Sequence, residues 1–316
     1  MSGRIVALAG GVGGAKLAHG LSALCGERLT VIVNTADDFE HLGLHVSPDL
    51  DTVMYTLGGI ANPSTGWGIS GETWNFLEQI GRLGGPGWFR LGDRDLATHV
   101  LRTQALRAGT RLTEVTDQLR NRLGILPRIL PMTDASVRTV VETEEGPLAF
   151  QDYFVGRQCN VVTRGFRFEG IEAARPSPEV TAAFHDDGLA AAFLCPSNPF
   201  VSLDPILGIA GIRQSLAHCA CPVIGVSPII GGAAVKGPAA KMLRELGFDV
   251  SALTVAERYR DVLDGFVIDT VDAAMAPRIS ALGIHVEVMR TLMSSDADRR
   301  NLAEACLAFA RRLAGD

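Results

Sequence analysis

The stretch RIVALAGGVGGAKLAHGLSAL, residues 4–24, predicts a strand, a glycine-rich turn and a helix in direct succession. Residues 5–9 are all apolar, as expected of a strand that is buried on both faces. In the helix, leucines recur at i, i+4 and i+7, so one side is apolar and must pack on a sheet. These are Leu17, Leu21 and Leu24. The stretch therefore predicts the first strand and helix of an α/β fold.

The turn between this strand and helix is a candidate phosphate-binding site. Four of its five residues, 10–14, are glycines, which can take positive φ and approach a ligand closely. The helix behind it offers unpaired N–H groups and the positive end of its dipole, and Lys16 adds a charge. Ala15-Lys16-Leu17 lacks the glycine and the hydroxyl of a P-loop, and a dinucleotide fingerprint begun at Gly11 places Lys16 where a small residue belongs. A tight turn without a ligand is the alternative.

Composition restricts the kind of protein and its partners. The chain has 316 residues, 47% of them hydrophobic, which suffices for one large α/β domain or two smaller ones. A net charge of −6 and a pI near 5.7 argue against a nucleic-acid surface. The sequence shows neither an apolar run of membrane-spanning length nor a signal-peptide pattern, so we expect a cytoplasmic protein without membrane contact. The six cysteines are expected to be buried thiols, since Cys219 and Cys221 have the wrong spacing for a zinc knuckle.

Aspartates gather after the second expected strand, residues 29–33. Four of them lie within fifteen residues: Asp37, Asp38, Asp49 and Asp51. The carboxyl end of a strand in an open parallel sheet is where ligands bind, and paired aspartates there suit a hard cation such as Mg²⁺. We expect Asp38 and Asp51 to hold it. The alternative, most plausible for Asp49, is that these acids favour the start of the helix that follows.

A second polar cluster spans residues 88–99, where two arginines, two aspartates and a histidine follow aromatic residues. Such a mixture can line a site for a flat heterocycle with a polar tail. Equally, it can be a capped helix with a solvated face, in which Asp95 is the plainest cap.

The remaining pattern predicts a Rossmann-like, mainly parallel sheet in a three-layer α/β/α arrangement with a small β-rich insertion. Residues 1–136 and 191–316 are expected to form the two parts of the core, and residues 137–190 the insertion, which begins with a hairpin over 139–155. Residues 291–293 are expected to end the sheet.

With these segments in place, the chain resembles the 2-phospho-L-lactate transferase family of coenzyme F420 biosynthesis along essentially its whole length. The resemblance rests on ordered motifs: the glycine turn with Lys16, and residues 34–38 (NTADD), 47–52 (SPDLDT), 91–95 (LGDRD) with 97–99 (ATH), 130–134 (LPMTD), 197–199 (SNP) and 226–231 (VSPIIG).

The resemblance implies a Mg²⁺-dependent transfer. The ribityl hydroxyl of 7,8-didemethyl-8-hydroxy-5-deazariboflavin attacks a guanosine diphosphate ester of a small carboxylic acid and releases GMP. It implies that Asp51 and Arg90 contact the deazaflavin, that Asp38 and Asp51 form the metal region, and that the protein is a homodimer. The other ligand-binding residues implied by the matching motifs are Gly11, Gly13, Gly14, Lys16, Asp93, Thr133, Ser197, Asn198, Ser227 and Gly231. For catalysis we expect Asp51, Asp38 and Lys16, with Asp51 the first choice of base.

One departure concerns the donor. Gly13-Gly14-Ala15 replaces the Gly-Thr-Pro form of archaeal members, which favours a bacterial-type donor carrying an enolpyruvyl or glyceryl group over a lactyl one. Two other functions remain open from the sequence. The chain could bind a nucleotide or deazaflavin without turnover, or it could be a paralogue that acts on another sugar nucleotide.

Overall fold

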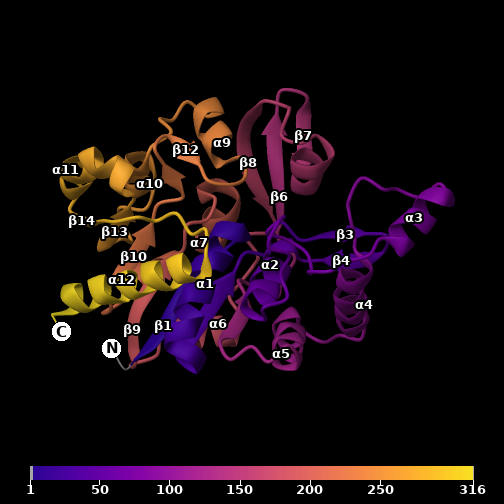
Figure 1. Ribbon diagram of the computed structural model, residues 1–316, viewed down its shortest axis with the longest axis horizontal. Helices are drawn as coiled ribbons and strands as arrows, with labels where there is room; N and C mark the ends of the chain where they lie inside the picture. Colours follow the sequence, from indigo (N-terminus) through magenta and orange to yellow (C-terminus); the bar gives the residue numbers. More distant parts are fainter. Residues whose placement is uncertain (1–2, 316) are drawn as a thin grey trace.

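The computed structural model describes residues 3–315, and its centre is a seven-stranded parallel sheet (Figure 1). The strand order is β14-β13-β10-β9-β1-β2-β5, and every pairing between neighbours is parallel. The strands are β1 (Arg4–Ala9), β2 (Leu29–Val33), β5 (Arg128–Pro131), β9 (Leu189–Leu194), β10 (Val223–Val226), β13 (Gly265–Ile268) and β14 (His285–Val288). The predicted fold class is therefore confirmed.

Helices cover both faces of this sheet because its central strands are apolar on both sides. Along β1, Ile5 and Ala7 face one hydrophobic core, and Val6 and Leu8 face the other. The first core is closed by α1 (Gly11–Cys25), α2 (Pro48–Leu57), α5 (Leu112–Arg122) and α12 (Asp296–Ala314). The second is closed by α6 (Pro178–Phe184), α7 (Asp204–Gly208), α8 (Ile212–Ala217), α9 (Ala239–Glu245), α10 (Ala252–Arg258) and α11 (Ala276–Ser280). The short helical turns are η1 (Gly26–Arg28), η3 (Pro199–Leu203) and η4 (Thr270–Met275).

The strand order reverses between β1 and β9. The chain runs outward from β1 through β2 to β5, then returns to the other side of β1 and runs outward again through β9, β10, β13 and β14. In an open α/β sheet, such a switch point leaves a crevice at the carboxyl ends of the strands. The loops after β1 and β9 meet there.

The segment after β5 forms a three-stranded antiparallel sheet above the carboxyl edge (Figure 1). Its strands are β6 (Arg138–Thr143), β7 (Gly146–Ala149) and β8 (Thr163–Glu169). The hairpin predicted over 139–155 is shorter than expected, because the helical turn η2 (Asp152–Gly156) replaces the end of its second strand. The division into domains at residues 136 and 190 stays a proposal.

An arm of shorter elements lies on the other side of the crevice. It consists of β3 (Phe39–His41), β4 (Leu44–Val46), α3 (Asn75–Arg82) and α4 (Asp93–Arg107), and Figure 1 shows β3 and β4 below β6 and above α4. A small pair, β11 (Ile229–Ile230) and β12 (Ala233–Ala234), follows β10.

Two expectations are corrected. Residues 291–293 form no strand, and the sheet ends at β14, where the pairing with β13 stops. Cys219 and Cys221 are joined by a disulfide, whereas Cys25, Cys195 and Cys306 are the buried free thiols that we expected. Among residues 3–315, no helix is both long and apolar enough to cross a membrane.

Candidate active site at the carboxyl edge of the sheet

The glycine turn owes its composition mainly to close packing. Helix α1 begins at Gly11, and Gly11 alone among the turn glycines has a positive φ, 61°. A Cβ on Gly13 would lie 2.2 Å from the carbonyl oxygen of Pro196, and one on Gly14 would lie 2.6 Å from Ser197 Oγ. Ser197 Oγ also accepts a hydrogen bond of 3.0 Å from the Gly10 N–H. The turn is therefore fitted against the loop after β9, across the switch point.

The positive end of α1 already holds an anion from within the protein. The Gly11 N–H donates to Asp49 Oδ1 at 2.8 Å, and Asn34 Nδ2 donates to Asp49 Oδ2 at 3.0 Å. Asp49 thus accepts a hydrogen bond from the start of α1, and it also lies in the first turn of α2, where the expected alternative placed it. Burial raises the pKa of Asp49 to about 6, although the hydrogen bonds from Asn34 and Gly11 act in the opposite direction. A phosphate at this turn would lie next to a carboxylate.

Asn34, at the end of β2, holds this acidic group together. Its Nδ2 also donates to Asp37 Oδ2 at 3.1 Å and to the Val201 carbonyl at 3.0 Å. Burial, and then the charge of Asp49, raise the pKa of Asp37. Neighbouring carboxylates in this environment gain from a nearby cation.

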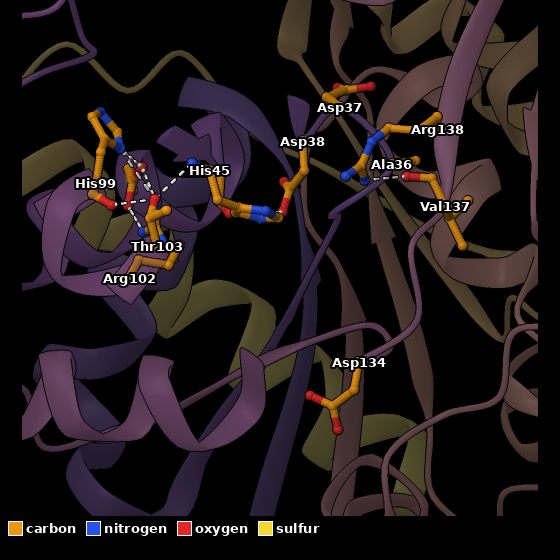
Figure 2. A network of polar contacts seen from close by, with 12 residues as sticks. Ala36, Asp37, Asp38, His45, His99, Arg102, Thr103, Asp134, Val137 and Arg138 are labelled. Carbon is orange, nitrogen blue, oxygen red and sulfur yellow. Dashed lines mark hydrogen bonds and ion pairs between the residues drawn. The ribbon is translucent and has the colours of Figure 1, made fainter. Parts of the chain in front are cut away.

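Asp38 is oriented by the arm. Its Oδ2 accepts a hydrogen bond of 2.7 Å from Ser47 Oγ and lies 3.0 Å from His45 Nε2, whereas its buried Oδ1 has no hydrogen-bond partner among the described residues. Figure 2 shows Asp38 between His45 and Arg138. The His45 N–H donates to Thr103 Oγ1 at 2.7 Å, which ties β4 to α4.

Asp51, on α2, belongs to a different cluster, between α2 and the arm helix α4. Both of its oxygens accept hydrogen bonds from Arg102, whose side chain is 1% exposed. One ligand atom each from Asp51, Asp95 and His99 lies within 4.8 Å of the others, so the three form a possible metal triad. However, the Arg102 guanidinium already provides positive charge there, 3.4 Å from His99 Nδ1. Asp38 is not part of this triad.

Sequence reasoning placed Asp95 and His99 in the polar cluster over residues 88–99 but missed their partners Arg102 and Tyr55. Asp95, His99 and Arg102 lie at i, i+4 and i+7 on α4, and Tyr55 from α2 donates to Asp95 Oδ1 at 2.6 Å. This polar stripe at helical spacing was the available signal, since it marks one face of α4 that must meet polar partners. Asp95, the expected cap, is instead a member of the buried network.

Lys16 lies on α1 two residues beyond Gly14, and its Nζ donates to the Met293 carbonyl at 2.7 Å. Burial, followed by the charges of Arg299 and Lys236, lowers its pKa. The lysine is thus half-buried beside other cations at the glycine turn.

Arg90 and Asp93 follow the aromatic pair of the second polar cluster. The Arg90 guanidinium stacks 4.2 Å above the Trp74 ring and is exposed. Asp93 accepts hydrogen bonds from Thr73 Oγ1 (2.7 Å), Phe76 N (3.0 Å) and Asn75 Nδ2 (2.8 Å), so it holds the start of α3. The hydrogen bond from Thr73 is the largest of the effects that lower the pKa of Asp93 to about 2.

Aromatic rings line the arm beside the crevice. His41 on β3 packs edge-on against Trp88, with ring centres 5.3 Å apart. A cavity of about 260 Å³ separates Trp88 from the insertion and is also lined by Leu148, Asp152, Gly156 and Arg157.

The other expected ligand-binding residues lie at the carboxyl ends of further strands, where hydrogen bonds hold their loops, two of them within the loop and two to distant segments. Their hydrogen bonds are Thr133 Oγ1 to the Arg175 carbonyl (2.6 Å), Phe200 N to Asn198 Oδ1 (3.0 Å), Ser227 Oγ to the Ile229 carbonyl (2.8 Å) and Gly231 N to Asp272 Oδ2 (3.0 Å). Together with the glycine turn, these loops border one edge of the sheet.

The fold and this edge define the class: a Rossmann-like α/β protein with a polar, carboxylate-rich site at its topological switch point. Comparison with known proteins narrows the class. The profile described as 2-phospho-L-lactate transferase CofD matches residues 5–298, and the chain belongs to that family of transferases.

Relatives with curated names cover almost the whole chain. A phosphoenolpyruvate transferase of Streptomyces griseus is 45% identical over 93% of this chain and 94% of its own. A 2-phospho-L-lactate transferase of Methanosarcina mazei is 40% identical over 95% of this chain and 98% of its own, and one of Methanopyrus kandleri is 40% identical over the full length of both. Among solved structures, a UPF0052 family protein of Bacillus halodurans shares the fold, with a TM-score of 0.63, 15% identity, and coverage of 96% of this chain and 99% of its own.

Proposed function

We propose that this protein transfers a phosphorylated small carboxylic acid from a guanosine diphosphate ester to the ribityl hydroxyl of 7,8-didemethyl-8-hydroxy-5-deazariboflavin in coenzyme F420 biosynthesis. The observation that carries the proposal is the family match over residues 5–298, which includes every loop at the carboxyl edge after β1, β2, β5, β9, β10 and β13. The hydroxyl oxygen forms a new bond to the phosphorus that bears the acid, the bond from that phosphorus to the GMP oxygen breaks, and the hydroxyl loses its proton.

We assign the guanylated donor to the glycine turn with the loops of Ser197 and Ser227, and the acceptor to the arm. Asp49 already accepts from the Gly11 N–H, so the attraction for a diphosphate there would come from the positive end of the α1 dipole and from Lys16. The arm offers Arg90, with aromatic rings at Trp74 and Trp88, which suit a flat heterocycle.

Mg²⁺ would fit the Asp37–Asp38 end of the acidic group. The unpartnered Oδ1 of Asp38 is a hard oxygen donor, and buried carboxylates nearby favour a divalent cation. We assign Asp38 and Asp37 to the ion, and we assign Asp51 to orienting the acceptor, since Arg102 occupies both of its oxygens. When bound, the ion would neutralise charge on the phosphoryl oxygens.

The chain itself would supply alignment and a proton acceptor. Phosphoryl transfer depends mainly on positioning and charge neutralisation, so a strong base is not required. We place proton acceptance on Asp49, because its hydrogen bond from the Gly11 N–H holds it at the glycine turn and burial raises its pKa above that of an ordinary carboxyl group.

For the transferred acid we propose an enolpyruvyl group. The turn lacks the archaeal Gly-Thr-Pro form, and the S. griseus relative named phosphoenolpyruvate transferase is more similar than the two 2-phospho-L-lactate transferases. The test is to incubate the purified protein with Mg²⁺, the deazaflavin and, separately, the guanylated esters of enolpyruvate, lactate and glycerate. Mass spectrometry should find GMP and a phosphodiester product, formed fastest with the enolpyruvyl donor. Saturable binding of both substrates without GMP release would instead identify a binding protein.

A further inference from the structure

Arg138, at the start of β6, is a charged residue of the crevice that the proposed function has not used. Its neighbour Thr139 donates a backbone hydrogen bond of 2.7 Å to the Ala36 carbonyl, directly before Asp37. This bond fixes the start of the insertion against the loop after β2. Figure 2 shows the Arg138 side chain extending back from β6 toward Ala36, with Asp37 on one side and Asp38 on the other.

The charge of Arg138 is not matched by a carboxylate of the protein. Its one described hydrogen bond runs from Nη1 to the carbonyl of Val137, at 2.9 Å, and it makes no ion pair within residues 3–315. The other arginines between the start of β6 and the end of β8 all have acidic partners: Arg157 pairs with Glu145, Arg164 with Glu144, and Arg167 with Glu142. Arg138 therefore keeps most of its guanidinium donors for another group.

We propose that Arg138 binds the carboxylate of the small acid carried by the donor. This inference rests on the proposed function, in which every alternative donor carries a carboxylate close to the transferred phosphorus. That carboxylate would have to enter a crevice already lined by Asp37, Asp38 and Asp49, which repel it. A guanidinium beside these residues removes the repulsion, and its fork of N–H groups matches a carboxylate bidentately.

The assignment separates Arg138 from the groups that hold the diphosphate. Lys16 and the N–H groups of α1 lie at the switch point beside β9, whereas Arg138 approaches the site from the insertion, next to the end of β2. GDP lacks the acid, so its affinity should not depend on Arg138. A donor ester has the carboxylate, so its affinity should.

The experiment compares Arg138→Gln and Arg138→Lys with Arg164→Gln, which removes an exposed arginine of the same sheet. For Arg138→Gln we expect the KM for the guanylated enolpyruvyl donor to rise at least tenfold, and the inhibition constant of GDP to change less than threefold. Arg138→Lys keeps the charge but loses the fork, so it should show a smaller rise in the same direction, and it replaces the glutamine variant if that variant does not fold. Arg164→Gln should behave as the wild type.

Two results would overturn the inference. An unchanged donor KM in both Arg138 variants would show that the residue does not touch the acid, and an equal loss for donor and GDP would place it on the diphosphate. If the wild type makes no product with any donor, the proposed function fails. Calorimetric titration of the enolpyruvyl ester and of GDP in the presence of chelator then still measures whether Arg138 distinguishes a ligand with a carboxylate from one without.

Discussion

Arg102 on α4 donates hydrogen bonds from both terminal nitrogens to the carboxylate of Asp51 on α2, and both side chains are almost fully buried. The pair joins α4 of the arm to α2 of the core. Burial opposes the charge of Arg102, but Asp51 more than offsets it, so that the pKa of the guanidinium is raised. Asp51 is consequently a structural anchor between α2 and α4.

Breaking this pair should destabilise the fold. Asp51→Asn leaves a buried guanidinium without its counter-charge, a change that typically costs about 3–5 kcal/mol. Denaturant unfolding should show that loss. Asp117→Asn is the control: its partner Arg120 lies one helical turn away and Asp117 is 44% exposed, so the loss should stay below about 1 kcal/mol. Equal, small losses in both variants would mean that the buried pair contributes no more than a surface one.

The Mg²⁺ dependence of the activity should show whether the ion binds at Asp38 or at the triad of Asp51, Asp95 and His99. Activity should disappear with EDTA and return with Mg²⁺, because the donor diphosphate is strongly anionic and the crevice is lined by carboxylates. Asp38→Asn should lower kcat by about 100-fold or more and raise the Mg²⁺ concentration needed for half-maximal rate. Asp95→Asn, in the triad of Asp51 and His99, should leave that concentration unchanged. The opposite pattern would move the ion to the triad, and full activity in EDTA would remove it from the mechanism.

Lys16 should act on the donor alone. Lys16→Met keeps the aliphatic stem and removes the charge, and we expect GDP binding to weaken by about 1.5–3 kcal/mol, as for one charge-assisted hydrogen bond. Deazaflavin affinity should be nearly unchanged. Calorimetric titration of each ligand measures both quantities, and equal losses would show that Lys16 serves the structure through its bond to the Met293 carbonyl.

Arg90 should act on the acceptor alone. Arg90→Ala should raise the KM for deazaflavin about tenfold or more, since a guanidinium can stack on a ring or hydrogen-bond to its oxygens, and should change donor KM less than threefold. Arg94→Ala is the matched control, because Arg94 lies four residues away and is held by the Ser70 carbonyl at 2.9 Å. A loss confined to the donor would reverse our assignment of the two ends of the site.

The fold could be predicted because its signals are local. Each buried strand of the sheet is a short apolar run that ends in a polar loop, and the glycine turn with its amphipathic helix marks where the first strand ends. The expected strand at residues 291–293 was wrong because three apolar or β-branched residues do not distinguish a strand from a loop packed on the core, where Met293 is buried.

The partners of the site residues could not be predicted, because they are distant in the sequence. Gly13 is required by the carbonyl of Pro196, and Asp51 pairs with a residue 51 positions away. Neither the glycine turn nor the aspartate cluster contains a signal from which such a distant partner could be predicted. The acidic group was visible in the sequence, but its separation into Asp37, Asp38 and Asp49 at the crevice and Asp51 at the contact with the arm depends on how α2 and α4 pack.

Asp49 should give the protein a distinct dependence of stability on pH. Burial raises its pKa to about 6 from an ordinary value near 3.8, so between about pH 4 and pH 6 the folded protein holds a proton that the unfolded chain has released. The contribution of Asp49 to the free energy of unfolding is therefore largest below pH 4, falls by up to about 3 kcal/mol as pH rises to 6, and is constant above that.

Asp49→Asn removes this dependence. Denaturant unfolding of both proteins from pH 4.5 to 7.5 should show the wild type losing stability relative to the variant as pH rises toward 6, while Asp187→Asn, at an exposed position, follows the wild type. Parallel curves for Asp49→Asn and wild type would show that the Asp49 carboxylate is ionised throughout this range, and would remove it as the proton acceptor near neutral pH.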